Sequence, residues 1–302
     1  MKKKLFALAV AAAMCLPLAA CSGGNNPGAA STPSQPAQTE SQAPSSTAPI
    51  GGADGPTDID VTDSDLEYIK SNGKMIIGYT VYEPMNYTDE NGDFTGFDTE
   101  LARAVCEKLG VEPEFIVINW DTKEVALEAG DIDCIWNGLT LDPEREANMA
   151  CTVPYVKNAQ VVVVKEGTDY VDTSSLAGKT VCAEIGSAGE TMCKGNEETE
   201  ADPGLAQAEF VGKSVQTDCL LEVKSGTADA AVLDMTLAHA MTGEGTNYAD
   251  LTIVDYLAEE NYGVAFRKGS DARDAVNEIF AEMVADGSMK ELADQYGLEL
   301  AD

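Results

Sequence analysis

An arginine stands where a helix is expected to begin, in the segment NGLTLDPEREANM at residues 137–149. Asp142 is the predicted N-cap, Pro143 takes the first helical position, and Arg145 follows in the first turn. The helix macrodipole makes a cation mildly unfavourable there. A planar guanidinium can, however, bind a carboxylate through two parallel hydrogen bonds. We therefore predict that Arg145 binds a ligand carboxylate, the alternative being an ion pair with Glu144 or another surface acid.

Three further residues stand at the ends of predicted strands, where open α/β sheets expose ligand sites. Thr140 can donate its hydroxyl to the same carboxylate, and Gly138 can offer its backbone to a ligand ammonium group. Asp234, at the end of ADAAVLD, would supply a negative charge for that ammonium. The structural alternatives are a plain strand-to-helix turn for the first two residues and a helix cap for Asp234.

The segment GSAGE at residues 186–190 has the spacing of a capping box, with Ser187 followed three residues later by Glu190. A capped helix start is also an anion site. The two roles are compatible for Ser187, and Glu190 is interpreted as structural.

The charge excludes some classes of partner. The chain has 302 residues, with 19 Lys and Arg against 52 Asp and Glu, and a formal charge of −33. Nucleic acid and bare anionic membranes are poor partners for such a chain. His239 is the single histidine, and CxxC or Cys/His zinc spacing is absent. We expect no metal, no cofactor and no Ser-His-Asp or Cys-His catalytic set.

The first residues, MKKKLFALAVAAAMCLPLAAC, combine a basic start, an apolar run and the ending LAAC. This pattern predicts a lipoprotein signal at residues 1–20 and an acylated Cys21 as the first residue of the mature chain. An ordinary signal peptide that precedes a cysteine is the alternative. Cleavage removes three lysines and changes the formal charge from −33 to −36. Later apolar runs fall short of the roughly 18 residues that a membrane span needs.

Residues 21–60 are rich in Ser, Pro, Gly, Ala, Gln and Thr, and predict a disordered tether. A glycosylated stalk is the alternative. The cysteines of the predicted mature chain beyond the lipid site are Cys106, Cys134, Cys151, Cys182, Cys193 and Cys219. Cys106 and Cys134 lie in apolar patterns and are interpreted as small core residues. Export permits disulfides, and Cys182, Cys193 or Cys219 could pair, with the connectivity left open.

The elements that position these residues alternate between strand and helix, which predicts βαβ units and an α/β fold. In the helix at 97–110, Asp98 is the predicted cap and Gly110 the end. Strands are predicted at 74–80, 114–119, 131–140, 179–187 and 228–234, and helices at 97–110, 122–130, 188–195, 217–226, 272–287 and 289–297. An internal repeat predicts two lobes with the same arrangement of elements. Residues 126–140 and 222–236 share one pattern: a helix, Gly, two residues, Asp, then an apolar strand.

Five segments, in order, carry a family resemblance: GYTVYEPMNYTDENGDFTGFDTELARAVCEKLG, NWDTKEVALEAGDIDCIWNGLTLDPER, VPYVKNAQVVVVK, LAGKTVCAEIGSAGE and NYGVAFRKGS. Over about residues 66–300 the chain resembles the extracellular solute-binding proteins of polar amino-acid ABC importers. The resemblance implies a two-lobed periplasmic-binding-protein-like fold (type II), two βαβ lobes joined by a two-strand hinge. Lobe 1 would comprise residues 61–157 and 262–302, lobe 2 residues 158–261, and the hinges residues 156–159 and 259–262.

The resemblance also implies roles for single residues. Tyr82 and Trp120 match aromatics that sandwich the ligand side chain, and Ser187 with the amide of Ala188 would hold the ligand carboxylate from the second lobe. Burial in the core is the alternative for the aromatics, and Trp136 is interpreted as core. The chain departs from the family pattern in three places. Asn137 replaces Ser or Ala and is assigned no role, Met85 replaces Phe, and a shorter first loop makes Tyr79 and Thr80 doubtful as ligand contacts.

Glu184 occupies a position where the family commonly carries Gln, Lys or another polar residue that reaches toward the ligand side chain. A carboxylate in the cleft would complement a cationic side chain and repel an acidic one. The alternative is that Glu184 faces solvent or pairs with a lysine such as Lys179, which leaves a neutral ligand such as glutamine or cystine open.

The predicted function is that of a lipid-anchored, extracytoplasmic and monomeric binding protein. It would capture a free polar amino acid, a cationic one if Glu184 enters the cleft, and present it to an ABC permease and its ATPase. The alternatives are an exported enzyme on the same fold, such as a dehydratase, and a ligand-sensing module.

Overall fold

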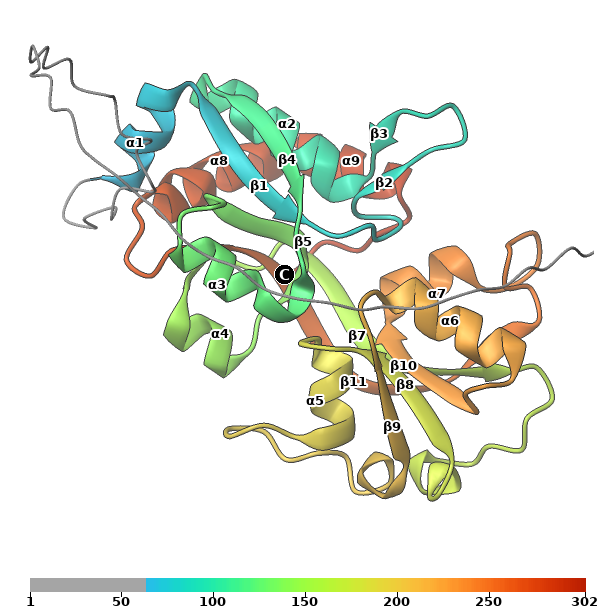
Figure 1. Cartoon of the computed structure of the whole chain (residues 1–302). Helices are drawn as coiled ribbons and strands as arrows, with labels where there is room; N and C mark the ends of the chain where they lie inside the picture. Colours follow the sequence, from blue (N-terminus) through green and yellow to red (C-terminus); the bar gives the residue numbers. More distant parts are fainter. Residues whose placement is uncertain (1–63) are drawn as a thin grey trace, which may run out of the picture. The chain divides into compact units, whose positions relative to one another are not determined.

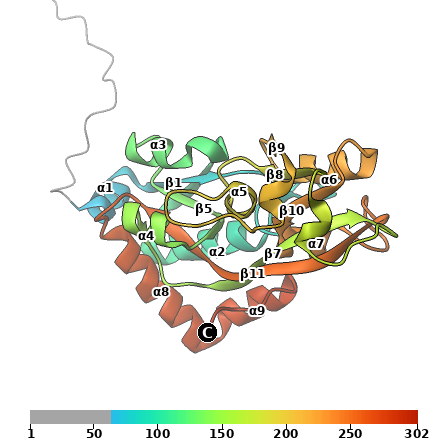
Figure 2. The ribbon, with the colours of Figure 1, turned by 90° about the horizontal axis from the view of Figure 1, so that it is seen from below.

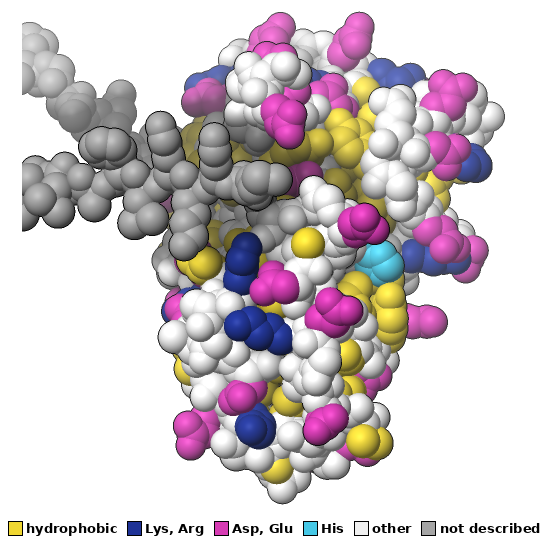
Figure 3. All heavy atoms as spheres, turned by 90° about the vertical axis from the view of Figure 1, so that its right-hand side faces the viewer, with side chains coloured by type: hydrophobic (Ala, Val, Ile, Leu, Met, Phe, Trp, Pro, Cys, Tyr) yellow, Lys and Arg dark blue, Asp and Glu magenta, His cyan; other side chains and the backbone are white. Residues whose placement is uncertain are grey.

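The computed structural model describes residues 64–302, which lie within one compact unit. The predicted signal, the lipid site at Cys21, the tether and the first residues of lobe 1 lie outside the described residues. Among the described helices, none is both long and apolar enough to cross a membrane. Acidic side chains are scattered over the face shown in Figure 3 and do not gather in one patch.

One mixed sheet runs through both lobes, in the order β4-β1-β5-β11-β7-β10-β8-β9, with β6 paired to β11. Strands β1, β4 and β5 are parallel and form the first lobe, and β8, β9 and β10 are parallel and form the second. Figure 1 shows the two groups of strands with their helices. The strands are β1 (Lys74–Tyr79), β4 (Glu112–Val117), β5 (Cys134–Thr140), β6 (Ala150–Cys151), β7 (Val156–Lys165), β8 (Thr180–Glu184), β9 (Glu209–Lys213), β10 (Ala230–Asp234) and β11 (Leu251–Phe266), with a separate hairpin of β2 (Tyr87–Thr88) and β3 (Phe94–Thr95).

The described helices follow the predicted alternation with the strands. They are α1 (Asp65–Asn72), α2 (Phe97–Leu109), α3 (Lys123–Glu128), α4 (Pro143–Asn148), α5 (Ala188–Lys194), α6 (Gln216–Ser225), α7 (Met235–Met241), α8 (Ala272–Asp286) and α9 (Ser288–Gln295), with 3₁₀ turns η1 (Trp120–Thr122), η2 (Thr173–Leu176) and η3 (Leu205–Gln207). Gly110 ends α2 in a left-handed conformation, as predicted.

Two long strands, β7 and β11, join the lobes. Strand β11 is 16 residues long and contains the TIVDY segment and the start of NYGVAFRKGS. It crosses between the two groups of strands in Figure 2. The predicted hinge segments are antiparallel partners, with Val156 opposite Tyr262 and Ala159 opposite Glu259. The β7–β11 ladder runs through both hinge segments, and its register shifts at residues 253–255 and 256–258.

The aspartate of the internal repeat has the same structural role in both lobes. The Asp133 Oδ2 atom accepts a hydrogen bond of 2.8 Å from the backbone N of Ile76, in the neighbouring parallel strand. Asp229 does the same in the second lobe, accepting from the backbone N of Thr180 at 2.9 Å. Each aspartate thus pins the start of one strand to its neighbour.

The predicted cap at Asp98 is wrong. Helix α2 begins one residue earlier, after Gly96, whose φ is 121° and whose position would place a Cβ 2.2 Å from the Met85 carbonyl oxygen. Asp98 is fully buried and accepts hydrogen bonds from the backbone N of Gly138 (2.6 Å) and the hydroxyl of Tyr155 (2.8 Å). Burial raises the pKa of Asp98 to about 7. Its side chain therefore supports the end of β5 and does not cap a helix.

The core predictions for cysteine and tryptophan are confirmed. Cys106 and Cys134 are fully buried, and Trp136 packs edge-on against Phe280 with ring centroids 5.8 Å apart. All six cysteines of the described residues are free thiols, including Cys182, Cys193 and Cys219. Residues 64–302 contain no group of three or more His, Cys, Asp or Glu side chains placed to hold a metal ion.

Candidate functional site

A cavity of about 350 Å³, including the part open to solvent, lies at the carboxyl ends of the strands, between residues of both lobes. All nine predicted ligand-binding residues line it: Tyr82, Trp120, Gly138, Thr140, Arg145, Glu184, Ser187, Ala188 and Asp234. Its other walls are formed by Thr80, Val81, Asn137, Gln216 and Leu237.

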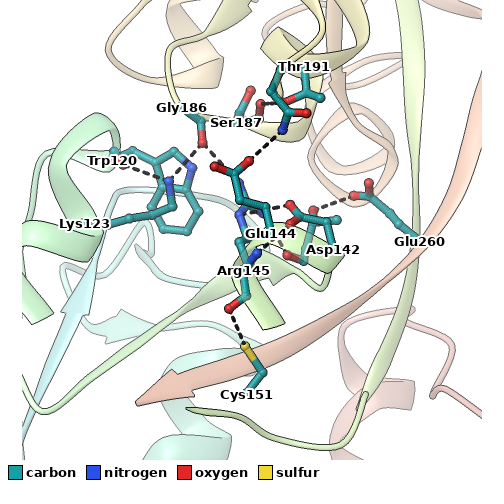
Figure 4. A network of polar contacts seen from close by, with 12 residues as sticks. Trp120, Lys123, Asp142, Glu144, Arg145, Cys151, Gly186, Ser187, Thr191 and Glu260 are labelled. Atoms are coloured by element: carbon teal, nitrogen blue, oxygen red, sulfur yellow. Dashed lines mark hydrogen bonds and ion pairs between the residues drawn. The ribbon is translucent and has the colours of Figure 1, made fainter. Parts of the chain in front are cut away.

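Arg145 is held over the cavity by its own helix start. Asp142 caps α4 by accepting from the backbone N of Arg145 (2.8 Å), and its Oδ2 lies 3.3 Å from Arg145 Nε. The guanidinium also donates to the carbonyl oxygens of Thr140 (2.8 Å) and Gly186 (3.1 Å). Only 6% of Arg145 is exposed, and Glu144 instead accepts from Asn196 at 2.7 Å. The ion pair of Arg145 is thus with Asp142, and the cation faces inward (Figure 4).

The Gly186 carbonyl joins the lobes, because it also accepts from Lys123 Nζ at 3.0 Å. Gly186 has a φ of 74°, and a Cβ there would lie 3.0 Å from Asp121 Cα in the other lobe. Lys123 Nζ stands 5.0 Å from the Trp120 ring centroid and donates to the Trp120 carbonyl at 3.2 Å. Burial, and then the charge of Arg145, lowers the pKa of Lys123 to about 8. Sequence reasoning missed Lys123, which reads as an ordinary helical lysine.

Tyr82 also spans the two lobes. Its hydroxyl lies 2.5 Å from Thr236 Oγ1 and 2.5 Å from the Tyr262 hydroxyl. Its ring covers Gly138, where φ is 56° and an added Cβ would lie 2.7 Å from Tyr82 Cε1. Gly138 is therefore required both for its left-handed backbone and for the close approach of this ring.

Ser187 caps α5, as predicted, with its Oγ accepting from the backbone N of Glu190 at 3.2 Å. The reciprocal half of the capping box is displaced by one residue, since Glu190 Oε2 accepts from the backbone N of Gly186 at 2.7 Å. Glu190 is thus structural, as interpreted, and it fixes the loop that carries the inter-lobe carbonyl.

Asn137 and Thr80 brace one wall of the cavity. Asn137 Oδ1 accepts from the Thr80 backbone N (3.0 Å) and hydroxyl (2.6 Å), while its Nδ2 donates to the Thr80 carbonyl (2.9 Å). Tyr79 turns away and packs against Phe94, with ring centroids 4.8 Å apart. Thr80 lines the cavity and Tyr79 does not.

Glu184 enters the cavity. It is 4% exposed, and its Oε1 has no hydrogen-bond partner among the described residues. Burial, followed by the charge of Asp234, raises the pKa of Glu184 to about 8. Lys179 stands instead 3.8 Å from Asp229. The alternatives of a solvent-facing Glu184 or a pair with Lys179 are therefore wrong.

Asp234 is surrounded by amides. Its Oδ1 accepts from Asn158 Nδ2 (2.9 Å) and Gln160 Nε2 (2.5 Å), and its Oδ2 accepts from Gln216 Nε2. Glu260 reaches the same donors from β11. Sequence reasoning missed Asn158, Gln160, Gln216 and Glu260. The signal for the first two was their i, i+2 spacing, which places both on one face of β7.

Arg145 and the carboxyl groups of Glu184 and Asp234 converge on a cavity between two α/β lobes, which is the architecture of two-lobed solute-binding proteins. The chain belongs to the bacterial extracellular solute-binding proteins, family 3, whose family model matches residues 75–299.

Named relatives agree with this assignment. The chain is 29% identical to the arginine-binding extracellular protein ArtP of Bacillus subtilis, over 72% of the chain and 84% of ArtP. A mutant of the arginine-binding protein ArgBP from T. maritima superposes with a TM-score of 0.70 and 31% identity, over 77% of this chain and 98% of that one. The ancestral amino acid-binding protein AncCDT-1, a precursor of cyclohexadienyl dehydratase, superposes with a TM-score of 0.68 and 30% identity, over 77% of this chain and 99% of that one.

Proposed function

We propose that this protein captures a free amino acid between its two lobes and delivers it to an ABC permease with its ATPase. The observation that carries the proposal is the convergence of the nine predicted residues on one cavity, with Arg145 and buried carboxyl groups in its walls. An amino acid brings a carboxylate and an ammonium group, and each must be paired once it is buried.

Each group of the ligand has a partner under this proposal. Arg145 binds the carboxylate from the first lobe, assisted by the Thr140 hydroxyl, which gives up its hydrogen bond to Glu260 when the ligand binds. Ser187 with the Ala188 amide binds the carboxylate from the second lobe. Asp234 binds the ammonium, next to the Gly138 backbone. The rings of Tyr82 and Trp120 enclose the side chain. The eight residues with these proposed roles all line the cavity: Tyr82, Trp120, Gly138, Thr140, Arg145, Ser187, Ala188 and Asp234.

The ligand class that fits is a cationic amino acid. Glu184 is buried with an unpaired oxygen, which a cationic ligand side chain would satisfy. The names of ArtP and ArgBP, which refer to arginine, support this class.

A thermal-shift screen of the twenty amino acids plus ornithine and cystine tests the proposal. We expect stabilisation by arginine, lysine, ornithine or histidine and none by glutamate or aspartate. Stabilisation by glutamate without lysine or arginine would refute the role of Glu184, and no stabilisation by any amino acid would refute the function.

Binding is accompanied by closure of lobe 1 (residues 61–157 and 262–302) over lobe 2 (158–261), by rotation about the paired hinge segments. Small-angle scattering with and without saturating ligand should give a smaller radius of gyration for the complex. An equal radius in both states would contradict closure.

Anchoring is proposed to occur through lipid on Cys21, with the protein acting as a monomer at the outer face of the cell membrane. Metabolic labelling with palmitate tests this point. A Cys21→Ser variant should lose the label and leave the membrane fraction, and retention of the label would refute the assignment.

The second candidate function is an enzyme on the same fold. The observation that favours it is the similarity to AncCDT-1, a dehydratase precursor, together with buried carboxyl groups of raised pKa that could donate protons. Incubation with the stabilising compound followed by chromatography decides between the two, because a binding protein returns the compound unchanged.

A further inference from the structure

The face of the sheet beneath the cavity carries two carboxyl groups in one shell of amides. Asp234 lies opposite Gln160 in the β10–β7 ladder, and Glu260 lies opposite Asn158 in the β11–β7 ladder. Asn158 Nδ2 donates to Asp234 Oδ1 at 2.9 Å and to Glu260 Oε1 at 2.6 Å. Gln160 Nε2 donates to the same two oxygens at 2.5 and 2.9 Å.

Because the same two nitrogens donate to both oxygens, the two carboxyl groups lie in one shell of donors. Two carboxylates that share a buried site cannot both ionise without a compensating charge. Burial raises the pKa of both groups, and the charge of Asp234 contributes to a pKa of about 8 for Glu260.

The other charged and titratable groups around the pair do not remove this need for a proton. Tyr82 and Tyr262 present hydroxyls, and Glu184 of β8 adds a third acid. Arg145 of α4 and Lys123 of α3 act on Glu184 from the opposite wall. Within residues 64–302, no lysine or arginine forms an ion pair with Asp234 or Glu260.

Asp234 and Glu184 line the cavity, where Glu184 Oε1 is buried without a partner among the described residues. Glu260 adjoins that wall through Thr140 and through the amides that it shares with Asp234. We propose that Glu260 is a second carboxyl of the ammonium site, and that the Asp234–Glu260 pair holds one proton which the ligand's ammonium group displaces into solvent. The charges balance, since one cation enters as one proton leaves.

Glu260 lies on β11, a strand that joins the lobes, and in this mechanism it helps Asp234 to bind the ligand ammonium. Thr140 Oγ1 donates to Glu260 Oε1 at 2.8 Å, so the same carboxyl links the end of β5 in the first lobe to the amide shell. Ligand binding would then be weaker at acidic pH, by up to tenfold per pH unit below the pKa of the pair, because a proton competes with the ammonium. The inference rests on the proposed amino-acid function.

Isothermal titration calorimetry in two buffers of different ionisation enthalpy measures the protons released on binding. The probe is arginine or, if arginine gives no heat, the amino acid that stabilises the protein most in the thermal screen. At pH 7 we expect Glu260→Gln to release about one proton fewer per bound ligand than the wild type. The Kd of the Glu260→Gln variant should also depend less on pH than the Kd of the wild type does, between pH 5.5 and 7.5.

Glu184→Gln is the comparison variant, since it removes a third buried acid and leaves Asp234, Glu260 and their Asn158 and Gln160 donors in place. Glu184→Gln should still release the proton of the Asp234–Glu260 pair on binding, whereas Glu260→Gln should not. A wild type that binds ligand at pH 7 without releasing protons would overturn the inference, even if Glu260→Gln failed to fold. Equal release by the wild type and Glu260→Gln would overturn it too. Absence of binding by the wild type would instead refute the proposed function.

Discussion

Replacement of Arg145 by alanine should abolish tight binding and preserve the fold. The cap of α4 survives, because Asp142 accepts from the backbone N of residue 145, which alanine retains. What disappears is the guanidinium, the one proposed cationic partner of the ligand carboxylate. Leaving a buried charge without its partner costs about 3–5 kcal/mol. The dissociation constant should therefore rise between about a hundredfold and several thousandfold.

Arg145 also makes a hydrogen bond between the lobes, to the Gly186 carbonyl, and this smaller effect must be separated from the first. Lys123→Met is the control, since Lys123 donates to the same carbonyl but does not line the cavity. The loss of one such bond contributes about 1 kcal/mol, or roughly fivefold in Kd. Calorimetry of both variants, with thermal unfolding to confirm that each is folded, makes the comparison. Equal losses for Arg145→Ala and Lys123→Met would show that Arg145 only fastens the lobes together.

Three further outcomes follow from the geometry. Gly186→Ala introduces a Cβ 3.0 Å from Asp121 Cα at a φ of 74°. It should therefore weaken ligand binding about tenfold or more and give the complex a larger radius of gyration in solution scattering. Unchanged affinity would contradict this. The ligand-free protein should lose stability as pH rises from 5 to 7, because folding raises the pKa of Asp98 to about 7 and those of Glu184 and Glu260 to about 8. Each proton retained by the folded state lowers the free energy of unfolding by about 1.4 kcal/mol for each unit of pH increase. Urea unfolding at several pH values measures this, and a free energy of unfolding that increases from pH 5 to 7 would refute the assignment. Thiol titration of denatured protein that starts at residue 61 should detect all six cysteines, whereas four would reveal a disulfide.

Sequence reasoning located the cavity because its main residues stand at element boundaries. Gly138 and Thr140 end one strand, Asp234 ends another, and Arg145 follows a helix cap. Such positions are marked by local patterns of Gly, Pro, Asp and apolar runs. The family resemblance added Tyr82, Trp120 and Glu184, whose placement local patterns do not determine.

The remaining residues depended on contacts between distant segments. Asp98 follows a turn and precedes an apolar stripe, which is the local signature of a cap, yet its partners are Gly138 and Tyr155, 40 and 57 residues away. Glu260 lies in a run of acids on a joining strand and reads as solvated surface. Its role depends on the register between β7 and β11, and a shift of one residue would turn it to the other face.

The pairing of β5 with β11 also determines when each lobe can be completed. Thr140 lies opposite Tyr262, so the sheet of the first lobe lacks a strand until nearly the whole second lobe has been synthesised. Pairing between segments so distant in sequence is slow, because a long loop must close before any contact forms. The second lobe draws its strands β7 to β10 from a shorter, continuous stretch. The lobe that is synthesised first is thus expected to be the last to finish folding.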